Sequence, residues 1–147
     1  MPKRQRTIGT TEDAITRAEV ALGRRFPSSF REWLLANNGL AINGVSIFPV
    51  LDDRDPRKTW DSIVRENREN WAAWLENFED EDRDFSHLLT FASCGKGDYY
   101  CFDYGQPTAG DEVFIVRWSH ETGETEARAH SFVEFAESVK AGAYEYD

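Results

Sequence analysis

Four short apolar runs in the second half of the chain restrict its fold more than any other feature. The runs LLTFAS, DYYCFDY, EVFIVRW and the weaker ETEARAH are separated only by CGKG, GQPTAG and SHETG. Connections of this length join antiparallel neighbours, because parallel strands need a crossover of a dozen or more residues. The pattern therefore predicts an antiparallel sheet made of consecutive strands.

A further strand is expected ahead of this series, in the stretch AINGVSIFPV. β-Branched residues surround an Asn43-Gly44 pair, which is typical of a tight turn. Residues 41–42 and 45–50 are therefore predicted to form either a hairpin or one strand after a turn.

Two helices are predicted near the N-terminus. TTEDAITRAEVALGRRF begins with Thr10 as its expected N-cap and ends before Pro27. This proline suits the first turn of a second helix, because its missing N–H has no partner there anyway. SSFREWLLANNG then has Ser29 and Glu32 at the spacing of a capping box, with Gly39 as the stop.

Two more helices are predicted further along the chain. From Lys58 to Phe78 the apolar residues follow an i, i+3, i+4, i+7 pattern, which predicts one long amphipathic helix. Its tryptophan-rich stripe could line a ligand site, although burial against a sheet is the commoner use of such residues. HSFVEFAESVKAG predicts a closing helix with Ser131 and Glu134 as capping box and Gly142 as stop.

Together these elements predict an α+β fold, and 147 residues is the usual length of one domain. We expect residues 1–147 to form a single domain with a mostly antiparallel, twisted sheet of about five to six strands. Helices pack on this sheet: two N-terminal, one long and central, and one C-terminal. Residues 1–9 are expected to be a flexible N-terminus.

The ends and the cysteines of the chain bear on its location. The basic N-terminus has no apolar segment behind it, and nowhere do eighteen apolar residues follow one another. Two cysteines, Cys94 and Cys101, are too few for a disulfide scaffold and fit a reducing compartment. We therefore expect a cytoplasmic protein without membrane contact. The sequence leaves the oligomeric state open between a monomer and a weak dimer.

The charge of the chain is unevenly distributed. The net charge is −10, but residues 1–34 carry seven Lys and Arg against four Asp and Glu, whereas residues 35–147 carry ten against 23. Such a surface repels nucleic acid. The acidity either keeps a small protein soluble or prepares a surface for a basic partner.

Two segments, LDDRDPRK and ENFEDEDRDF, concentrate the carboxylates. The first lacks the glycine and the closing glutamate of a calcium loop, so we expect no metal there. Like charges at such density stay solvated, either as a wet loop or as a site that docks a basic surface. The candidate partner-binding residues are Asp52, Asp53, Asp55, Glu76, Glu79, Asp80, Glu81, Asp82 and Asp84.

The stretch ASCGKGDYYCFDY resembles a reactive site but is better explained as a turn. Gly95 and Gly97 lie between two predicted strands, so they supply positive φ to a hairpin, whereas a phosphate-binding loop must lead into a helix. Cys94 and Cys101 lack the spacing of zinc ligands and are expected to be buried apolar fillers. A nucleophilic cysteine would need a histidine brought close by the fold.

Glu19 is the other residue with a possible chemical role. It lies on the apolar stripe of the first helix, where a carboxylate could be a catalytic acid but is more often paired with an arginine or a backbone N–H. Arg24, Arg25 and Arg31 are close in sequence. With no carboxylate pair, catalytic triad or ligand cluster, we expect neither enzymatic activity nor any metal or cofactor.

The ordered motifs resemble the Smi/Knr-type domain of the SUKH superfamily from Ile15 to about Val139. The likeness rests on LGRRFP, NNG, LLTFASCGKGDYYCFDY, HETGE and SFVEF in this order. Residues carried over from the family's motifs are Glu19, Pro27, Asn38, Gly39, Gly97 and Asp98, whereas Phe26 and Leu40 depart from the usual leucine and glycine.

This resemblance implies a binding domain without catalysis, since the family includes bacterial immunity proteins and fungal cell-wall assembly regulators. The first hypothesis is an immunity protein that binds a cognate, basic, nuclease-type toxin. The alternative is a regulatory interaction module, although the long flanking segments of the fungal regulators are missing here. A small enzyme is the third and least supported alternative.

Overall fold

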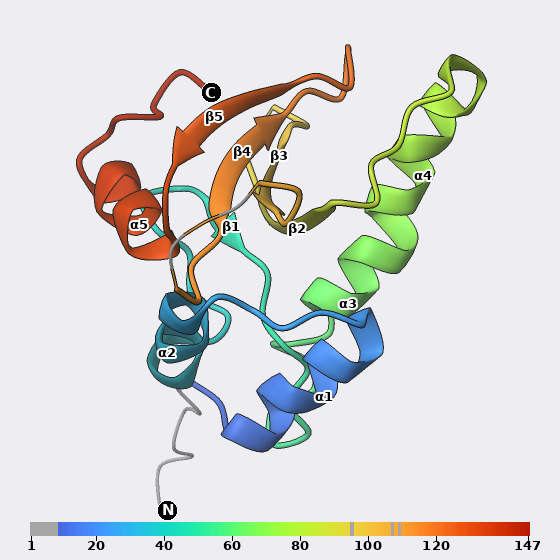
Figure 1. Ribbon diagram of the computed structural model, residues 1–147. Coiled ribbons are helices and arrows are strands. Elements are labelled where there is room, and N and C mark those ends of the chain that lie inside the picture. The colour runs from blue at the N-terminus through green and yellow to red at the C-terminus, as the bar shows by residue number, and fades with distance from the viewer. Residues whose placement is uncertain (1–8, 95, 107, 109) are drawn as a thin grey trace, which may run out of the picture.

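The computed structural model describes residues 9–147 apart from residues 95, 107 and 109, and these residues form an α+β domain (Figure 1). Its sheet has five strands in the order β1-β2-β3-β4-β5, and every neighbouring pair is antiparallel. The strands are β1 (Ser46–Ile47), β2 (Leu88–Ser93), β3 (Tyr99–Asp103), β4 (Phe114–Trp118) and β5 (Thr125–Ala129). The predicted fold class and the consecutive antiparallel strands are confirmed.

The segment before β2 forms less strand than expected. Residues Ile42 and Val45 make an isolated antiparallel bridge around Asn43 and Gly44, whose φ angles are +42° and +84°. The predicted turn is therefore confirmed, but β1 has only two residues and pairs with the end of β2.

Gly9, which we assigned to a flexible N-terminus, is buried with φ +76°, and a Cβ there would lie 1.9 Å from the Leu35 carbonyl oxygen. Gly9 thus belongs to the fold, while residues 1–8 lie outside the described part.

The two N-terminal helices are α1 (Glu12–Leu22) and α2 (Ser28–Asn37), and both begin differently from the prediction. The Thr11 hydroxyl caps α1 by accepting from the Ala14 N–H at 3.1 Å, whereas Thr10 bonds elsewhere. Pro27 takes the N-cap position of α2. The predicted capping box of α2 is wrong because Ser29 donates to Glu112, a carboxylate distant in sequence.

The long helical segment runs from Ile63 to Glu81 as α3 (Ile63–Glu66), η1 (Asn67–Trp71), α4 (Ala72–Leu75) and η2 (Glu76–Glu81). We call this segment the long helix. It starts five residues later than predicted because Ser62 caps it, accepting from the Arg65 N–H at 3.2 Å. The side chain of Asn67 donates to the Thr90 carbonyl at 2.9 Å and accepts from the Thr90 N–H at 3.2 Å, which fixes the helix to a bulge in β2.

Helix α5 (Phe132–Lys140) closes the domain where the closing helix was predicted. The Ser131 hydroxyl accepts from the Glu134 N–H at 3.1 Å, as a capping box requires. The carboxylate of Glu134, however, accepts from the N–H of His130 instead of that of Ser131. Gly142 follows the helix with φ +79°, as expected of a stop.

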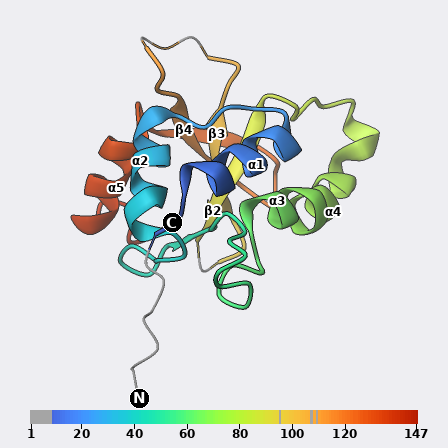
Figure 2. The same cartoon turned by 90° about the horizontal axis from the view of Figure 1, so that it is seen from below.

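The sheet has an aromatic cluster on each face. Neighbouring residues of β3 point to opposite sides, so Tyr100 contacts Phe135 of α5 while Tyr99 contacts Trp71 of the long helix. On the first side Phe30 of α2 stacks edge-on against the β2 and β3 phenylalanines. Figure 2 shows α1 between α2 and the long helix, on the underside of the domain. The sheet is thus covered by α2 and α5 on one face and by the long helix on the other.

Candidate functional site

The two acidic segments lie at opposite ends of the long helix (Figure 1). Residues 52–55, which we call the Asp52 loop, precede its N-cap at Ser62, and residues 76–84 form its far end and the turn that follows. A helix from Ile63 to Glu81 is about 28 Å long at ~1.5 Å per residue. Because salt screens exposed charges beyond about 8 Å, the two segments do not act as one charged rim.

Asp52 is not available to a partner. Only 4% of it is exposed, against our expectation that the whole segment is solvated. Its carboxylate accepts from the Thr10 hydroxyl at 2.7 Å and from Arg54 at 2.7 Å. The hydrogen bonds from Arg54, together with that from Thr10, hold the pKa of Asp52 well below its usual range. Asp52 therefore connects this loop to the start of α1 as a structural residue.

The other two aspartates of the Asp52 loop also make contacts within the domain, Asp53 through its carboxylate and Asp55 through its backbone carbonyl. Asp53 is exposed and pairs with Arg17 of α1 at 3.3 Å. Asp55 is partly buried, and its backbone carbonyl accepts from the Thr59 hydroxyl at 2.8 Å. Two of the three carboxylates in this loop thus already have arginine partners within the domain.

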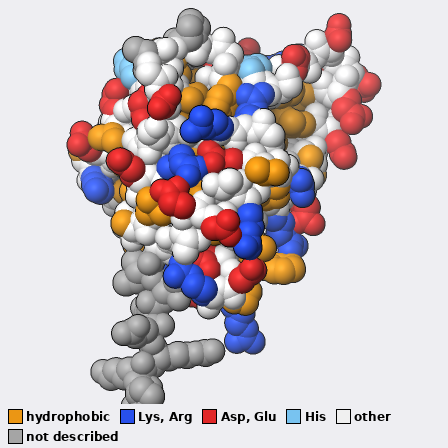
Figure 3. Space-filling model, turned by 60° about the horizontal axis from the view of Figure 1, so that its bottom comes forward, with side chains coloured by type: hydrophobic (Ala, Val, Ile, Leu, Met, Phe, Trp, Pro, Cys, Tyr) orange, Lys and Arg blue, Asp and Glu red, His pale blue; other side chains and the backbone are white. Residues whose placement is uncertain are grey.

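The far end of the long helix keeps its carboxylates in solvent, as predicted. Its six exposed acidic residues, which we call the acidic tip, are Glu76, Glu79, Asp80, Glu81, Asp82 and Asp84. Figure 3 shows acidic side chains gathered on a projecting part of the molecule at upper right. One arginine, Arg83, pairs with Glu81 at 3.2 Å, and its guanidinium also donates to the carbonyls of Thr122 and Gly123 at 2.6 and 2.7 Å.

Two residues of the acidic tip have a defined local conformation. Asp82 ends the helix with φ +53°, a left-handed conformation that aspartate tolerates better than most side chains. Asp84 accepts from the Ser86 N–H at 2.8 Å, and the hydrogen bonds from Ser86 lower the pKa of its carboxyl group. The tip is therefore an ordered turn that carries a dense negative charge.

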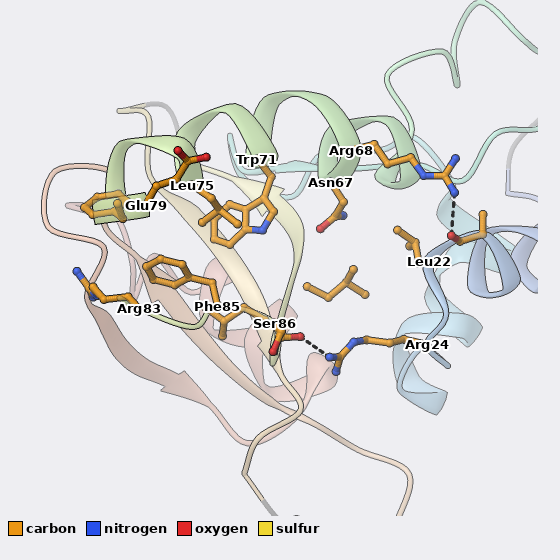
Figure 4. Close-up of a pocket in the computed structure, with 14 residues that line it drawn as sticks. Leu22, Arg24, Asn67, Arg68, Trp71, Leu75, Glu79, Arg83, Phe85 and Ser86 are labelled. Atoms are coloured by element: carbon orange, nitrogen blue, oxygen red, sulfur yellow. Dashed lines mark hydrogen bonds between the residues drawn. The ribbon is translucent and has the colours of Figure 1, made fainter. Parts of the chain in front are cut away.

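A hollow of about 580 Å³ lies beside the acidic tip, between the end of α1, the long helix and the start of β2 (Figure 4). Its apolar lining includes Leu22, Trp71 and Phe85. Arg24 and Arg68 stand at one side, where they donate to the backbone carbonyls of Ser86 and Ala21. The sequence did not reveal this hollow: it suggested Arg24 only as a neighbour of Glu19, and helical periodicity places Arg68 on the solvent side without saying which residue it contacts.

The family motif residues form contacts between neighbouring segments of the domain. Glu19 accepts from the Phe26 N–H at 2.6 Å and pairs with Arg31, so the predicted arginine or backbone pairing is confirmed. Pro27 starts α2. The Asn38 amide donates to the Val50 carbonyl at 3.0 Å and accepts from the Val50 N–H at 2.9 Å, and Gly39 follows with φ +86°.

The second motif pair lies in the β2–β3 hairpin. Gly97 has the predicted positive φ, +93°, and a Cβ there would approach the His120 ring to 3.2 Å. Asp98 is buried and pairs with Arg117 and with His120 Nδ1 at 2.5 Å. Burial acts to raise the pKa of Asp98, but these hydrogen bonds and the charge of Arg117 outweigh it and lower the pKa. Gly95, the other glycine of this loop, lies outside the described residues.

The described residues include two free, buried cysteines. Burial raises the pKa of the Cys94 and Cys101 thiols, so they are poor nucleophiles and fit the predicted role as fillers. Within the same described part, no group of three or more His, Cys, Asp or Glu side chains could hold a metal ion. Nor does that part contain a helix of the length and apolarity that a membrane span requires.

Comparison with known proteins agrees with the sequence resemblance. The family model described as "SMI1 / KNR4 family (SUKH-1)" matches residues 9–138, which is most of the chain. No curated protein matches the sequence.

Proposed function

Because the chain belongs to the SMI1 / KNR4 family (SUKH-1), we propose that it is an immunity-type protein that neutralises a toxin by direct binding. The toxin domain is basic and of the nuclease class, and the encounter takes place in the cytoplasm. The protein acts by occupying the toxin surface and has no catalytic step of its own.

The acidic tip is the observation that carries this proposal. Six exposed carboxylates with one neighbouring arginine produce a local negative field on an already acidic protein. Charges at the rim of an interface accelerate encounter and select partners more than they add affinity. A nuclease domain presents a basic surface to its own substrate, so the same surface is complementary to the tip.

The test begins by inspecting the neighbouring genes for a nuclease-type domain, which is then co-expressed with the protein and purified. The variant reverses two charges, Glu76→Lys with Asp80→Lys, and both side chains are exposed. Asp82 is left unchanged, since lysine at φ +53° would strain the turn. We expect association to slow by about tenfold at physiological salt, with a flatter salt dependence and protection of cells reduced.

A matched control separates the tip from net charge. Glu137→Lys with Glu145→Lys changes the total charge by the same amount on exposed positions of α5 and the C-terminal segment. Equal slowing by the two double variants would assign the effect to total charge and contradict docking at the tip. Lack of binding between the unmodified protein and the adjacent nuclease would overturn the immunity function itself.

A further inference from the structure

A second hollow continues the one beside the acidic tip along the contact between α1 and the long helix. It measures about 480 Å³ and shares Ala21 and Arg68 with the first hollow of about 580 Å³. We call the two together the seam groove. The Arg68 side chain, which donates to the Ala21 carbonyl at 2.9 Å, lies where the two hollows meet.

The seam groove has large apolar side chains in its lining. Trp60 and Leu51, at 59% and 47% exposure, are among the few large apolar side chains that the described residues leave in solvent, and both line the second hollow. Leu22, Leu75 and Phe85 continue the apolar lining in the first hollow. Contiguous exposed apolar surface of this kind marks interaction sites, and tryptophan and arginine are enriched where binding energy concentrates.

The charge of the groove is opposite to that of the protein. Five arginines line it against three carboxylates, on a chain with a net charge of −10. Three of the arginines are neutralised by acidic neighbours: Arg17 by Asp53 at 3.3 Å, Arg65 by Glu69 at 2.7 Å, and Arg83 by Glu81 at 3.2 Å. The remaining two are Arg24 and Arg68.

Arg68 borders both hollows, whereas Arg24 borders only the first and lies over the Tyr104 ring, 4.6 Å from its centroid. Among the described residues, no salt bridge involves either one. Their hydrogen bonds go to backbone carbonyls, Arg68 to Ala21 at 2.9 Å and Arg24 to Ser86, as the dashed lines in Figure 4 show. A guanidinium has five N–H donors, so these bonds fix its position and leave donors for a carboxylate.

From this arrangement we propose that the seam groove binds a segment of a protein partner that carries a large apolar side chain next to a carboxylate. The apolar side chain lies against Trp60, and the carboxylate bonds to Arg68, which borders both hollows. Because the Arg68 side chain is already positioned by its bond to the Ala21 carbonyl, binding costs little side-chain ordering. The site goes beyond the proposed function: it selects acidic segments, which the acidic tip repels.

The test is selection from a phage-displayed library of random twelve-residue peptides on the full chain. We expect enrichment of peptides with Asp or Glu beside Phe, Trp, Leu or Ile. Selected peptides are then synthesised with a fluorescent label, and their dissociation constants are measured by fluorescence polarisation. Arg68→Glu and Trp60→Ala should each weaken binding by about tenfold or more.

Matched controls change the same chemistry outside the groove. Arg57→Glu reverses an exposed arginine, and Val20→Ala trims an apolar side chain that is 77% exposed. Both should leave affinity within about twofold, since surface changes away from the site have small effects. The proposal is overturned if no peptide is enriched, if the enriched peptides are basic, or if Arg68→Glu and Arg57→Glu weaken binding equally. All four positions are exposed, and unchanged melting temperatures verify that the variants fold.

Discussion

The Asp52 loop and the acidic tip have similar sequences but different surroundings in the fold. In both DDRD and EDEDRD one arginine interrupts a run of carboxylates, so the sequence pattern predicts the same solvated segment for each. In the fold, Asp52 is buried between Thr10 and Arg54, whereas the carboxylates of the tip remain in solvent. The difference arises from a hydroxyl 42 residues away in sequence. Acidic density therefore does not identify a docking surface until the neighbours of each carboxylate are known.

The largest effect is expected at Asp52. Asp52→Ala leaves the buried Thr10 hydroxyl without its acceptor and removes the hydrogen bonds from Arg54, which should lower the free energy of unfolding by about 2–4 kcal/mol. The control Asp53→Ala, one residue further and exposed, should cost no more than about 0.5 kcal/mol. Urea denaturation measures both, and equal losses would show that the two positions are equivalent after all.

The comparison extends to a second buried carboxylate, Asp98, and the glycine before it. Gly97→Val places a β-branched side chain at φ +93° and against the His120 ring, which should destabilise by about 1–3 kcal/mol. Lys96→Ala in the same hairpin changes an exposed side chain and should have little effect. Indistinguishable melting temperatures for the two variants would contradict the assigned role of Gly97.

The stability that Asp52 contributes to the folded protein should decrease at acid pH. The pKa of Asp52 is lowered in the folded protein, so the stability that it contributes is fully present above the unfolded pKa of about 3.9 and is lost as the pH falls through the folded value. The gap between the unfolding free energies of the wild type and Asp52→Asn, measured from pH 7 to pH 2.5, should therefore be constant above about pH 4 and narrow steadily below it. A constant gap across this range would mean that Asp52 acts through its shape and not through its charge.

The smallest effect is expected at the acidic tip. Glu76→Gln and Asp80→Asn remove exposed charges from a crowded acidic segment, so the free energy of unfolding should stay within about 0.5 kcal/mol or rise slightly at low salt. Chemical denaturation at two salt concentrations measures this. A loss above 1 kcal/mol in either variant would reveal a structural role like that of Asp52 and weaken the tip as a docking surface.

Local pattern predicted the elements of this fold better than their ends and contacts. The four consecutive strands and the closing helix follow from apolar alternation and short connections, which act within a few residues. Trp60 matches the apolar phase of the long helix, yet Ser62 caps the helix after it and leaves Trp60 in solvent. The pairing of Glu19 could be predicted because its partners Phe26 and Arg31 are near in the chain.

The candidate sites were less predictable for the same reason. The acidic tip could be recognised because exposure of a dense charge run needs no partner. The burial of Asp52 depends on Thr10, and the seam groove depends on how α1 meets the long helix at Arg68. These contacts join segments more than forty residues apart, and nothing in either segment alone specifies its partner.

The attachment of Arg83 to the carbonyls of Thr122 and Gly123 has a consequence for recognition. The turn after the long helix is tied to the loop between β4 and β5, and Phe78 at the helix end packs on Trp118 of the sheet. The backbone of the acidic tip is therefore anchored to the sheet and its β4–β5 loop, which sets its position relative to the rest of the surface. A peptide copying residues 76–84 has the same charge without that geometry, and should inhibit the complex only weakly.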